Sequence, residues 1–390
     1  MLYINDYAEM RGDLTLKQCP YNEIDYLIFS VLSYICADGI IGNDYQHTYT
    51  LKEFYQLYKQ RNQTLEEDEY KKICNESHYL LEKLAELPRY QNIRIVAYVN
   101  DINKELVKQF SAMTFLLEDE TMVIAYRGTD DSLVGWHEDF LMLCENTVPA
   151  QLSSLKYLQK AALYPYQCSF KESINNSFLD SSLIKRIKKH FLYKKERPII
   201  LVGHSKGGNL AMFSGCFCEE NIQKRIQHIY NYDGPGFQED IIHSPQYQNC
   251  LHKIESYIPH YSFFGIVLNH EEDYHVVQSN AKGMLQHNAF YWNVGREHFV
   301  QDELSMESVD FAIKVILFLE KLSDDDKHVL VDTMFHLFDQ LELYTFSDLS
   351  HMSYKHILNA VKELSLLDSK VRKMLIEVLH MLWLEAKKTK

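Results

Sequence analysis

The chain has 390 residues, of which 46% are apolar and 24% charged, as in soluble globular proteins. Its 54 acidic and 40 basic residues give a net charge of −14, which argues against a protein that wraps nucleic acid. The 14 glycines and 8 prolines are few for this length, which excludes collagen-like, glycine-rich disordered and turn-dense all-β chains and favours long helices.

The first 90 residues are predicted to be mainly helical. An apolar stripe at helical spacing indicates one helix that ends at Asp38-Gly39, and its members are Ile24, Leu27, Ile28, Val31, Leu32 and Ile35. Thr64 precedes an acidic turn of the type that begins a helix. We therefore expect a helical N-terminal segment over about residues 1–90.

Short runs rich in β-branched and aromatic residues follow, and they predict strands. The first three cover residues 93–99, 112–117 and 121–126, and the last two are joined by a predicted hairpin turn at Glu118–Glu120. From Pro198 onward, strands alternate with helical stretches, and the predicted strands cover residues 198–202, 226–232, 253–258 and 274–278. This alternation predicts an α/β fold with a mainly parallel central sheet.

Residues 301–390 contain neither glycine nor proline, and we expect them to form a helical C-terminal appendage to a domain covering residues 1–300. Three apolar faces at helical spacing support this division. They comprise Val309, Ala312, Ile313, Ile316 and Leu319; then, after Ser323, Leu330, Thr333, Met334, Leu337 and Phe338; and finally Val371, Leu375, Val378, Leu379 and Leu382.

The 8 cysteines are scattered, without the paired spacing of a zinc site or a disulfide framework, so we interpret them as buried thiols and expect no metal. The N-terminus lacks the basic and apolar regions of a signal peptide. The longest apolar stretch, residues 27–37, is too short to span a bilayer. These features predict a cytoplasmic protein with no transmembrane segment.

A possible catalytic serine lies in Gly203-His204-Ser205-Lys206-Gly207, which matches the pattern G-x-S-x-G. The five residues alone are a weak signal. Here, however, a predicted buried strand ends directly before them and a helix starts at Asn209 directly after them. That context predicts a tight turn that exposes the Ser205 hydroxyl, with a helix N-terminus facing the developing negative charge. The alternative is a glycine-rich strand-to-helix turn with a capping serine.

A serine hydroxyl needs a base, and that base needs an acid to orient it. In hydrolases built on this turn, the chain order is serine, acid, histidine. Four histidines follow the last predicted strands closely enough to serve, namely His270, His275, His287 and His298. We favour His287, which lies in a loop before the aromatic run Phe290-Tyr-Trp.

Two aspartates compete for the role of the acid. Asp233 comes directly after the strand predicted at 226–232, in a turn at the carboxyl edge of the sheet. Asp273 lies one strand later. We favour Asp233, although its Asp-Gly-Pro-Gly sequence is also typical of a plain turn.

The tetrahedral intermediate needs two hydrogen-bond donors. The N–H of Lys206, directly after the serine, is the first candidate. The second is expected from the loop at 126–131, which supplies a glycine and a hydroxyl. The apolar segment 261–268 either lines an acyl pocket or packs in the core.

Several segments together resemble known proteins. Ala125–Thr129 with Trp136 and Asp139, and the serine turn Gly203–Gly208, are similar to motifs of class 3 (fungal-type) lipases. A closer resemblance is to a bacterial family of α/β-hydrolases, the DUF2974 or Mbeg1-like proteins. It extends over about residues 20–300 and rests on residues 127–131, 135–140, 202–211, 232–237 and 280–287.

The resemblance implies an α/β-hydrolase fold and a serine-hydrolase site. By position in the motifs, it makes Ser205 the nucleophile and His287 the base. Thr129 and the Lys206 amide form the oxyanion hole, and Asp139 orients Thr129. The lipase pattern expects its acid after the strand ending near Ile258, where residues 259–265 contain none, so Asp233 takes that role.

The sequence thus predicts a serine hydrolase that cleaves a carboxylic ester or thioester of a small-molecule or lipid substrate, without a cofactor. Contact with a membrane surface is compatible with this activity. The alternatives are an amide-cleaving serine hydrolase and a non-catalytic binding protein with a hydrolase fold.

Overall fold

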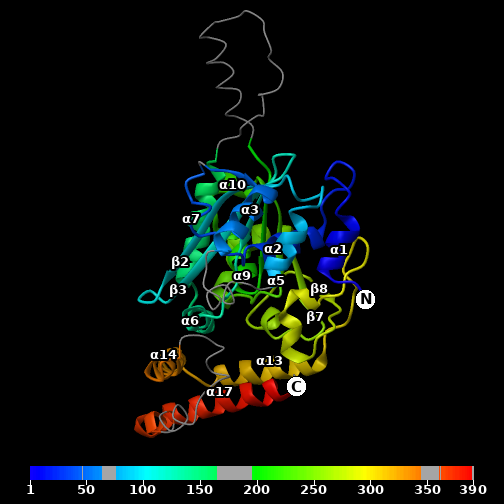
Figure 1. Cartoon of the computed structure of the whole chain (residues 1–390). Coiled ribbons are helices and arrows are strands. Elements are labelled where there is room, and N and C mark those ends of the chain that lie inside the picture. The colour runs from blue at the N-terminus through cyan, green and yellow to red at the C-terminus, as the bar shows by residue number, and fades with distance from the viewer. Residues whose placement is uncertain (46, 64–75, 165–195, 344–359, 361, 389–390) are drawn as a thin grey trace, which may run out of the picture.

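The computed structural model describes residues 1–45, 47–63, 76–164, 196–343, 360 and 362–388 (Figure 1). An eight-stranded sheet lies at its centre, and the strands follow one another across the sheet in chain order. They are β1 (Tyr49–Thr50), β2 (Arg94–Asn103), β3 (Lys108–Leu116), β4 (Met122–Tyr126), β5 (Ile199–His204), β6 (Ile226–Tyr232), β7 (Ile254–Pro259) and β8 (Tyr274–Val277).

The sheet has an antiparallel half and a parallel half. Strands β1 to β4 pair antiparallel, and β4 to β8 pair parallel. The parallel half requires crossover connections, which the helices between β4 and β8 supply. The predicted α/β-hydrolase fold with a mainly parallel sheet is therefore confirmed, as is the hairpin between β3 and β4.

Helices cover both faces of the sheet (Figure 1). One face packs against α1 (Ile4–Arg11), α2 (Glu23–Leu32), α3 (Leu51–Asn62) and α5 (Glu76–Leu84). The other packs against α7 (Pro149–Ala162), α9 (Lys206–Phe217) and α12 (Pro245–Cys250). Further helices in this part of the chain are α6 (Leu133–Leu141), α10 (Glu220–Gln223) and α11 (Glu239–Ile242), and the 3₁₀ turns are η1 (Leu251–Lys253), η2 (Phe264–Ile266), η3 (Gly283–His287) and η4 (Ala289–Tyr291).

Strand β5 explains why the site lies at the centre of the molecule. Its residues are all buried, with Ile200 and Val202 in the core on one face and Ile199 and Leu201 in the core on the other. A strand covered on both faces needs a continuous apolar run, which is the pattern of this segment. Burial of each such side chain contributes about 1.5–3 kcal/mol, so the end of β5 is firmly held.

Helix α2 ends earlier than predicted. Its last residue is Leu32, and the chain continues in tighter turns in which Tyr34 N–H donates to the carbonyl of Val31 and Ile35 N–H to that of Leu32. The Ser33 hydroxyl also donates to the carbonyl of Ser30, at 2.6 Å. Such side-chain hydrogen bonds compete with the backbone hydrogen bonds of the helix, so the apolar stripe extends beyond the last helical residue. The helix predicted at Thr64 lies outside the described residues.

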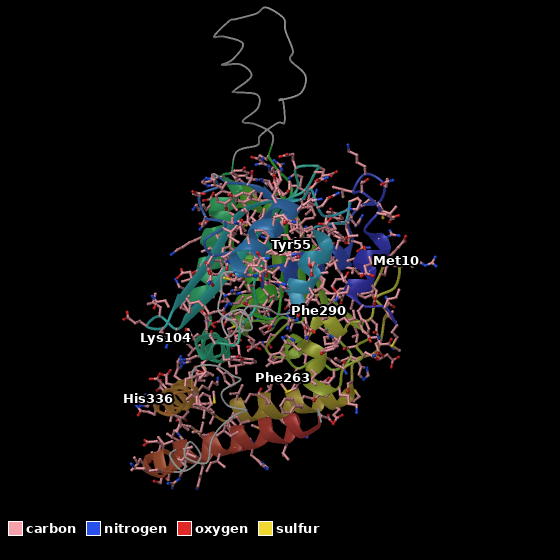
Figure 2. All side chains as sticks on the ribbon, in the orientation of Figure 1. Met10, Tyr55, Lys104, Phe263, Phe290 and His336 are labelled. Atoms are coloured by element: carbon pink, nitrogen blue, oxygen red, sulfur yellow. The ribbon has the colours of Figure 1, made fainter. Side chains whose placement is uncertain are left out.

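Three further helices, α13 (Met306–Leu319), α14 (Asp324–Gln340) and α17 (Ser369–Lys388), lie together at one end of the molecule (Figure 1). With residues of α6 they enclose a separate apolar core that contains Leu141, Phe318, Met334 and Leu375. Helix α14 packs against α6 and α17, and α17 also contacts η3. Phe263 packs against Phe311 of α13, with ring centroids 5.0 Å apart (Figure 2).

The predicted faces of α13 and α14 are partly wrong. Ile313 is 47% exposed, whereas Phe311 and Phe318 are buried. In α14, Val331 and Phe335 are buried although they lie outside the predicted face, and Thr333 is only half-buried, whereas Phe338 packs against the core as predicted. Both helices carry apolar residues around much of their circumference, so spacing alone does not determine which side faces the core.

Within the described residues, no helix combines the length and apolar character needed to cross a membrane.

Candidate active site

The register of the parallel strands brings three loops to one edge of the sheet. In β4, β5 and β6, Tyr126 pairs with Gly203, and His204 pairs with Tyr232. The residues that follow these strands therefore lie side by side at their carboxyl ends, where open α/β sheets bind ligands. They include Thr129, Ser205 and Asp233.

A cavity of about 440 Å³ opens at this edge. Ser205, His287, Thr129 and Asp139 supply polar groups to its wall. Most of the remaining wall is apolar or aromatic, and includes Val31, Trp136, Phe264, Met284, Leu285 and Phe290, the last of which is labelled in Figure 2. Among the described residues, the cavity lining contains no lysine or arginine. Of the segment 261–268, Phe264 lines the cavity, while Tyr261 and Val267 are buried in the protein.

Ser205 occupies a strained turn between β5 and α9. Its backbone has φ of +58° and ψ of −136°, a conformation that non-glycine residues rarely adopt. The turn is held because Ser205 N–H donates to the carbonyl of Tyr232 at 2.9 Å. Strand and helix approach so closely that a Cβ at Gly203 would lie 2.0 Å from the carbonyl oxygen of Gly207. Only glycine fits there, and the serine is left half-exposed at the cavity.

Asp233 and His287 form a hydrogen bond of 2.6 Å between Oδ2 and Nδ1. Asp233 is fully buried, and its other oxygen accepts bonds from the Ser262 hydroxyl at 2.5 Å and the Gly265 N–H at 3.1 Å. Because a carboxylate only accepts, His287 donates through Nδ1, and in the neutral ring Nε2 is the atom that can accept a proton. The imidazole is thus fixed in one tautomer.

The competing aspartate is placed differently. Asp273 is exposed and precedes β8, so it lies at the amino edge of the parallel strands, opposite the cavity. Of the other histidines, His270 contacts Glu272, His298 contacts Glu23, and His275 is exposed in β8. The structure therefore brings His287, and none of these three, to the cavity wall.

His204 links the serine turn to the His287 loop. Its Nε2 donates to the carbonyl of His287 at 2.7 Å, and its Nδ1 lies 3.1 Å from the Tyr34 hydroxyl. Burial, together with the nearby His287, lowers the pKa of His204 to about 3, so this ring is neutral. The sequence analysis did not identify His204 or Tyr34 as part of the site, although His204 lies inside the recognised motif.

The Thr129 hydroxyl donates to Asp139 Oδ2 at 2.5 Å. The loop before Thr129 lies directly against the serine turn, because a Cβ at Gly128 would meet the Tyr34 hydroxyl oxygen at 2.2 Å and the His204 carbonyl oxygen at 2.5 Å. Asp139 lies on α6, and burial raises the pKa of its carboxyl. The structure thus brings Thr129 and Asp139 together beside Ser205.

Lys206 is almost fully buried, although it follows Ser205 directly. Its ammonium nitrogen lies 3.1 Å from Glu138 Oε2 and 3.3 Å from Asp139 Oδ1. As the first residue of α9, it also has a backbone N–H without an acceptor inside the helix. Glu138 is a contact that sequence reasoning missed, and its only signal was its position next to Asp139 in the recognised segment.

No group of three or more histidine, cysteine, aspartate or glutamate side chains suited to a metal ion is found within the described ranges.

Comparison with known proteins gives the following similarities. The M37 lipase is 16% identical, with a TM-score of 0.33, over 61% of this chain and 68% of that one. The native Rhizomucor miehei lipase propeptide complex is 11% identical, with a TM-score of 0.34, over 65% of this chain and 67% of that one. A fungal lipase–inhibitor complex is 10% identical, with a TM-score of 0.36, over 70% and 80%.

No curated protein matches the chain. The model of the Mbeg1-like family, by contrast, matches residues 84–336, which include the serine turn, Asp233 and His287. The match covers well over half of the sequence and confirms the resemblance seen in its motifs. This chain belongs to the Mbeg1-like family.

Proposed function

We propose that this protein is a serine hydrolase that cleaves a carboxylic ester or thioester through an acyl-enzyme on Ser205. The observation that carries the proposal is the hydrogen bond between Asp233 and His287 at the wall of the cavity that also contains Ser205. A serine in a strained strand-to-helix turn, with a histidine oriented by a buried carboxylate, is the arrangement that activates a hydroxyl for acyl transfer.

Each proposed role follows from the atoms available. The Ser205 oxygen attacks the acyl carbon while Nε2 of His287 takes its proton, and His287 then returns that proton to the leaving alcohol or thiol. A water molecule, deprotonated by the same nitrogen, releases the acid from Ser205. Asp233 orients the imidazole through Oδ2, and the two hydrogen bonds that its Oδ1 accepts hold the carboxyl group in place.

The negative oxygen of the tetrahedral intermediate requires donors fixed in advance. We assign this role to the backbone N–H of Lys206 and to Thr129. Because the Thr129 hydroxyl is already donated to Asp139, the backbone N–H of Thr129 is the group left to face the oxyanion. Asp139 therefore acts by fixing the position of Thr129.

The cavity wall favours an uncharged acyl group. Apolar and aromatic side chains dominate it, and none of the described residues that line it is a lysine or arginine that could pair with a phosphate or carboxylate on the acyl part. We therefore place the acyl chain of a small-molecule or lipid ester in this cavity.

The first test is labelling by a fluorophosphonate probe, which reacts with activated serines. The folded wild type should be labelled, and Ser205→Ala should not. Ser153→Ala is a matched control that should keep the label, since its hydroxyl binds the Pro149 carbonyl within α7. A folded wild type that takes no label would favour the non-catalytic binding protein and contradict the proposal.

The second test separates the two candidate acids by their effect on turnover of p-nitrophenyl butyrate. Asp233→Asn should lower kcat by about 10⁴-fold, because the amide no longer fixes the required His287 tautomer. Asp273→Asn should leave kcat about unchanged. The opposite ranking, or equal losses in both variants, would remove Asp233 from the proposed triad.

The third test uses the low pKa of His204. A base that accepts the serine proton must itself be unprotonated, and His204, with a pKa of about 3, stays neutral and adds no second titration at moderately acid pH. A plot of log kcat/KM against pH should therefore have an acid limb of slope one. A slope of two would show that His204 also titrates.

The pH range for this test needs a control for folding. His204 is neutral in the fold but takes up a proton near pH 6.5 when unfolded, so the free energy of unfolding decreases as the pH falls below that value. Circular dichroism at each pH should show an unchanged folded signal where rates are compared.

A further inference from the structure

A buried lysine follows the proposed nucleophile directly in the chain. The Lys206 side chain is only 1% exposed and belongs to the first residue of α9. The N-terminal end of a helix is the positive end of its dipole, which is an unfavourable place for an ammonium group. Burial of a charge is costly as well, and apolar residues often replace buried ion pairs without loss of stability. A lysine here therefore calls for an explanation beyond packing.

One side of the ammonium is held by an anchored carboxylate. Glu138 Oε2 lies 3.1 Å from the ammonium nitrogen and accepts the backbone N–H of Gln109 at 2.9 Å. Its Oε1 accepts the backbone N–H of Ala150 at 2.7 Å. These bonds connect Glu138 to β3 and α7, so Glu138 and the ammonium bound to it have a fixed position.

The other side of the ammonium faces Asp139, the residue that binds the Thr129 hydroxyl. Asp139 Oδ1 lies 3.3 Å from the Lys206 nitrogen, while Asp139 Oδ2 accepts the Thr129 hydroxyl. Burial raises the pKa of Asp139, and the Lys206 charge opposes that shift and favours the carboxylate, the form that can accept from Thr129. A continuous chain of contacts therefore leads from Glu138 through Lys206 and Asp139 to Thr129.

We propose that Lys206 is a positioning residue that fixes the two oxyanion donors relative to each other. Its backbone N–H is one donor. Its side chain fixes Asp139, which in turn fixes Thr129, the other donor. This inference rests on the proposed function, because it concerns the same reaction.

A double-mutant cycle tests the connection. Lys206→Met removes the ammonium and keeps most of the side-chain volume, and Thr129→Val removes the hydroxyl that binds Asp139. We expect each change to lower kcat on p-nitrophenyl butyrate by roughly 10- to 100-fold, below the loss of about 10²–10³ for a whole oxyanion donor, with KM about unchanged. The kcat of the double variant should be only slightly lower than that of the more impaired single variant. If the fold-loss of kcat in the double variant equals the product of the two single fold-losses, Lys206 does not act through Thr129. That result would overturn the inference.

A second variant allows for misfolding of Lys206→Met, which leaves two carboxylates without their cation. Lys206→Met with Glu138→Gln removes one of these charges, and should raise the thermal midpoint relative to Lys206→Met alone without restoring kcat. Recovery of wild-type kcat would overturn the inference. Lys224→Met is the matched control, because Lys224 forms an exposed ion pair with Glu220 on the surface, and its kcat should equal that of the wild type.

The two proposals fail in different ways. A folded wild type that does not hydrolyse the ester contradicts the proposed function. An active wild type whose kcat survives both Lys206 variants contradicts the role of Lys206 alone.

Discussion

The close approach of β5 and α9 is the constraint on which the rest of the site depends. With no room for a Cβ between Gly203 and Gly207, the chain turns within one residue, and Ser205 takes a backbone conformation that it would otherwise avoid. The cost of this strain is met by a strand buried on both faces and a helix buried from Lys206 to Cys216. The parallel register then sets the distance from this turn to the two neighbouring loops, because the loops after β4 and β6 start beside it. One packing contact thus positions Ser205, the loop that carries Thr129, and Asp233 together.

Charge at the site is controlled by burial and by anchoring. His204 is kept neutral and donates to the His287 carbonyl, so it fixes the His287 loop without adding a charge there. The carboxylates of Asp233 and Glu138 each accept hydrogen bonds from backbone N–H groups, which keep them in place. Lys206 balances part of the negative charge of Glu138 and Asp139. The helices α14 and α17 reach this region from outside, through α6 and η3.

Local patterns predicted most of the sheet, because strands such as β4 and β5 are marked by apolar runs between turn signals. The serine turn was predictable for the same reason, since its glycines are required by a contact within the same segment. Contacts between distant segments could not be predicted in this way. The bond from His204 to His287 and the pairing of Lys206 with Glu138 depend on how the loops and α6 cross the sheet edge. The choice between Asp233 and Asp273 stayed open in the sequence because it depends on which of the two carboxylates reaches His287, a contact between distant segments. The domain boundary at residue 300 stays a prediction, and the family match extends past it into α14.

The central claim is that an acyl group is transferred to Ser205. It is tested most directly by mixing the enzyme with a p-nitrophenyl ester, quenching with acid within milliseconds, and measuring the mass of the peptide that contains residue 205. The account predicts an added acyl mass on Ser205 that forms at the rate of nitrophenol release and is absent from Ser205→Ala. An active enzyme that turns over the ester with no such adduct on that peptide, or with the adduct on another residue, would contradict it.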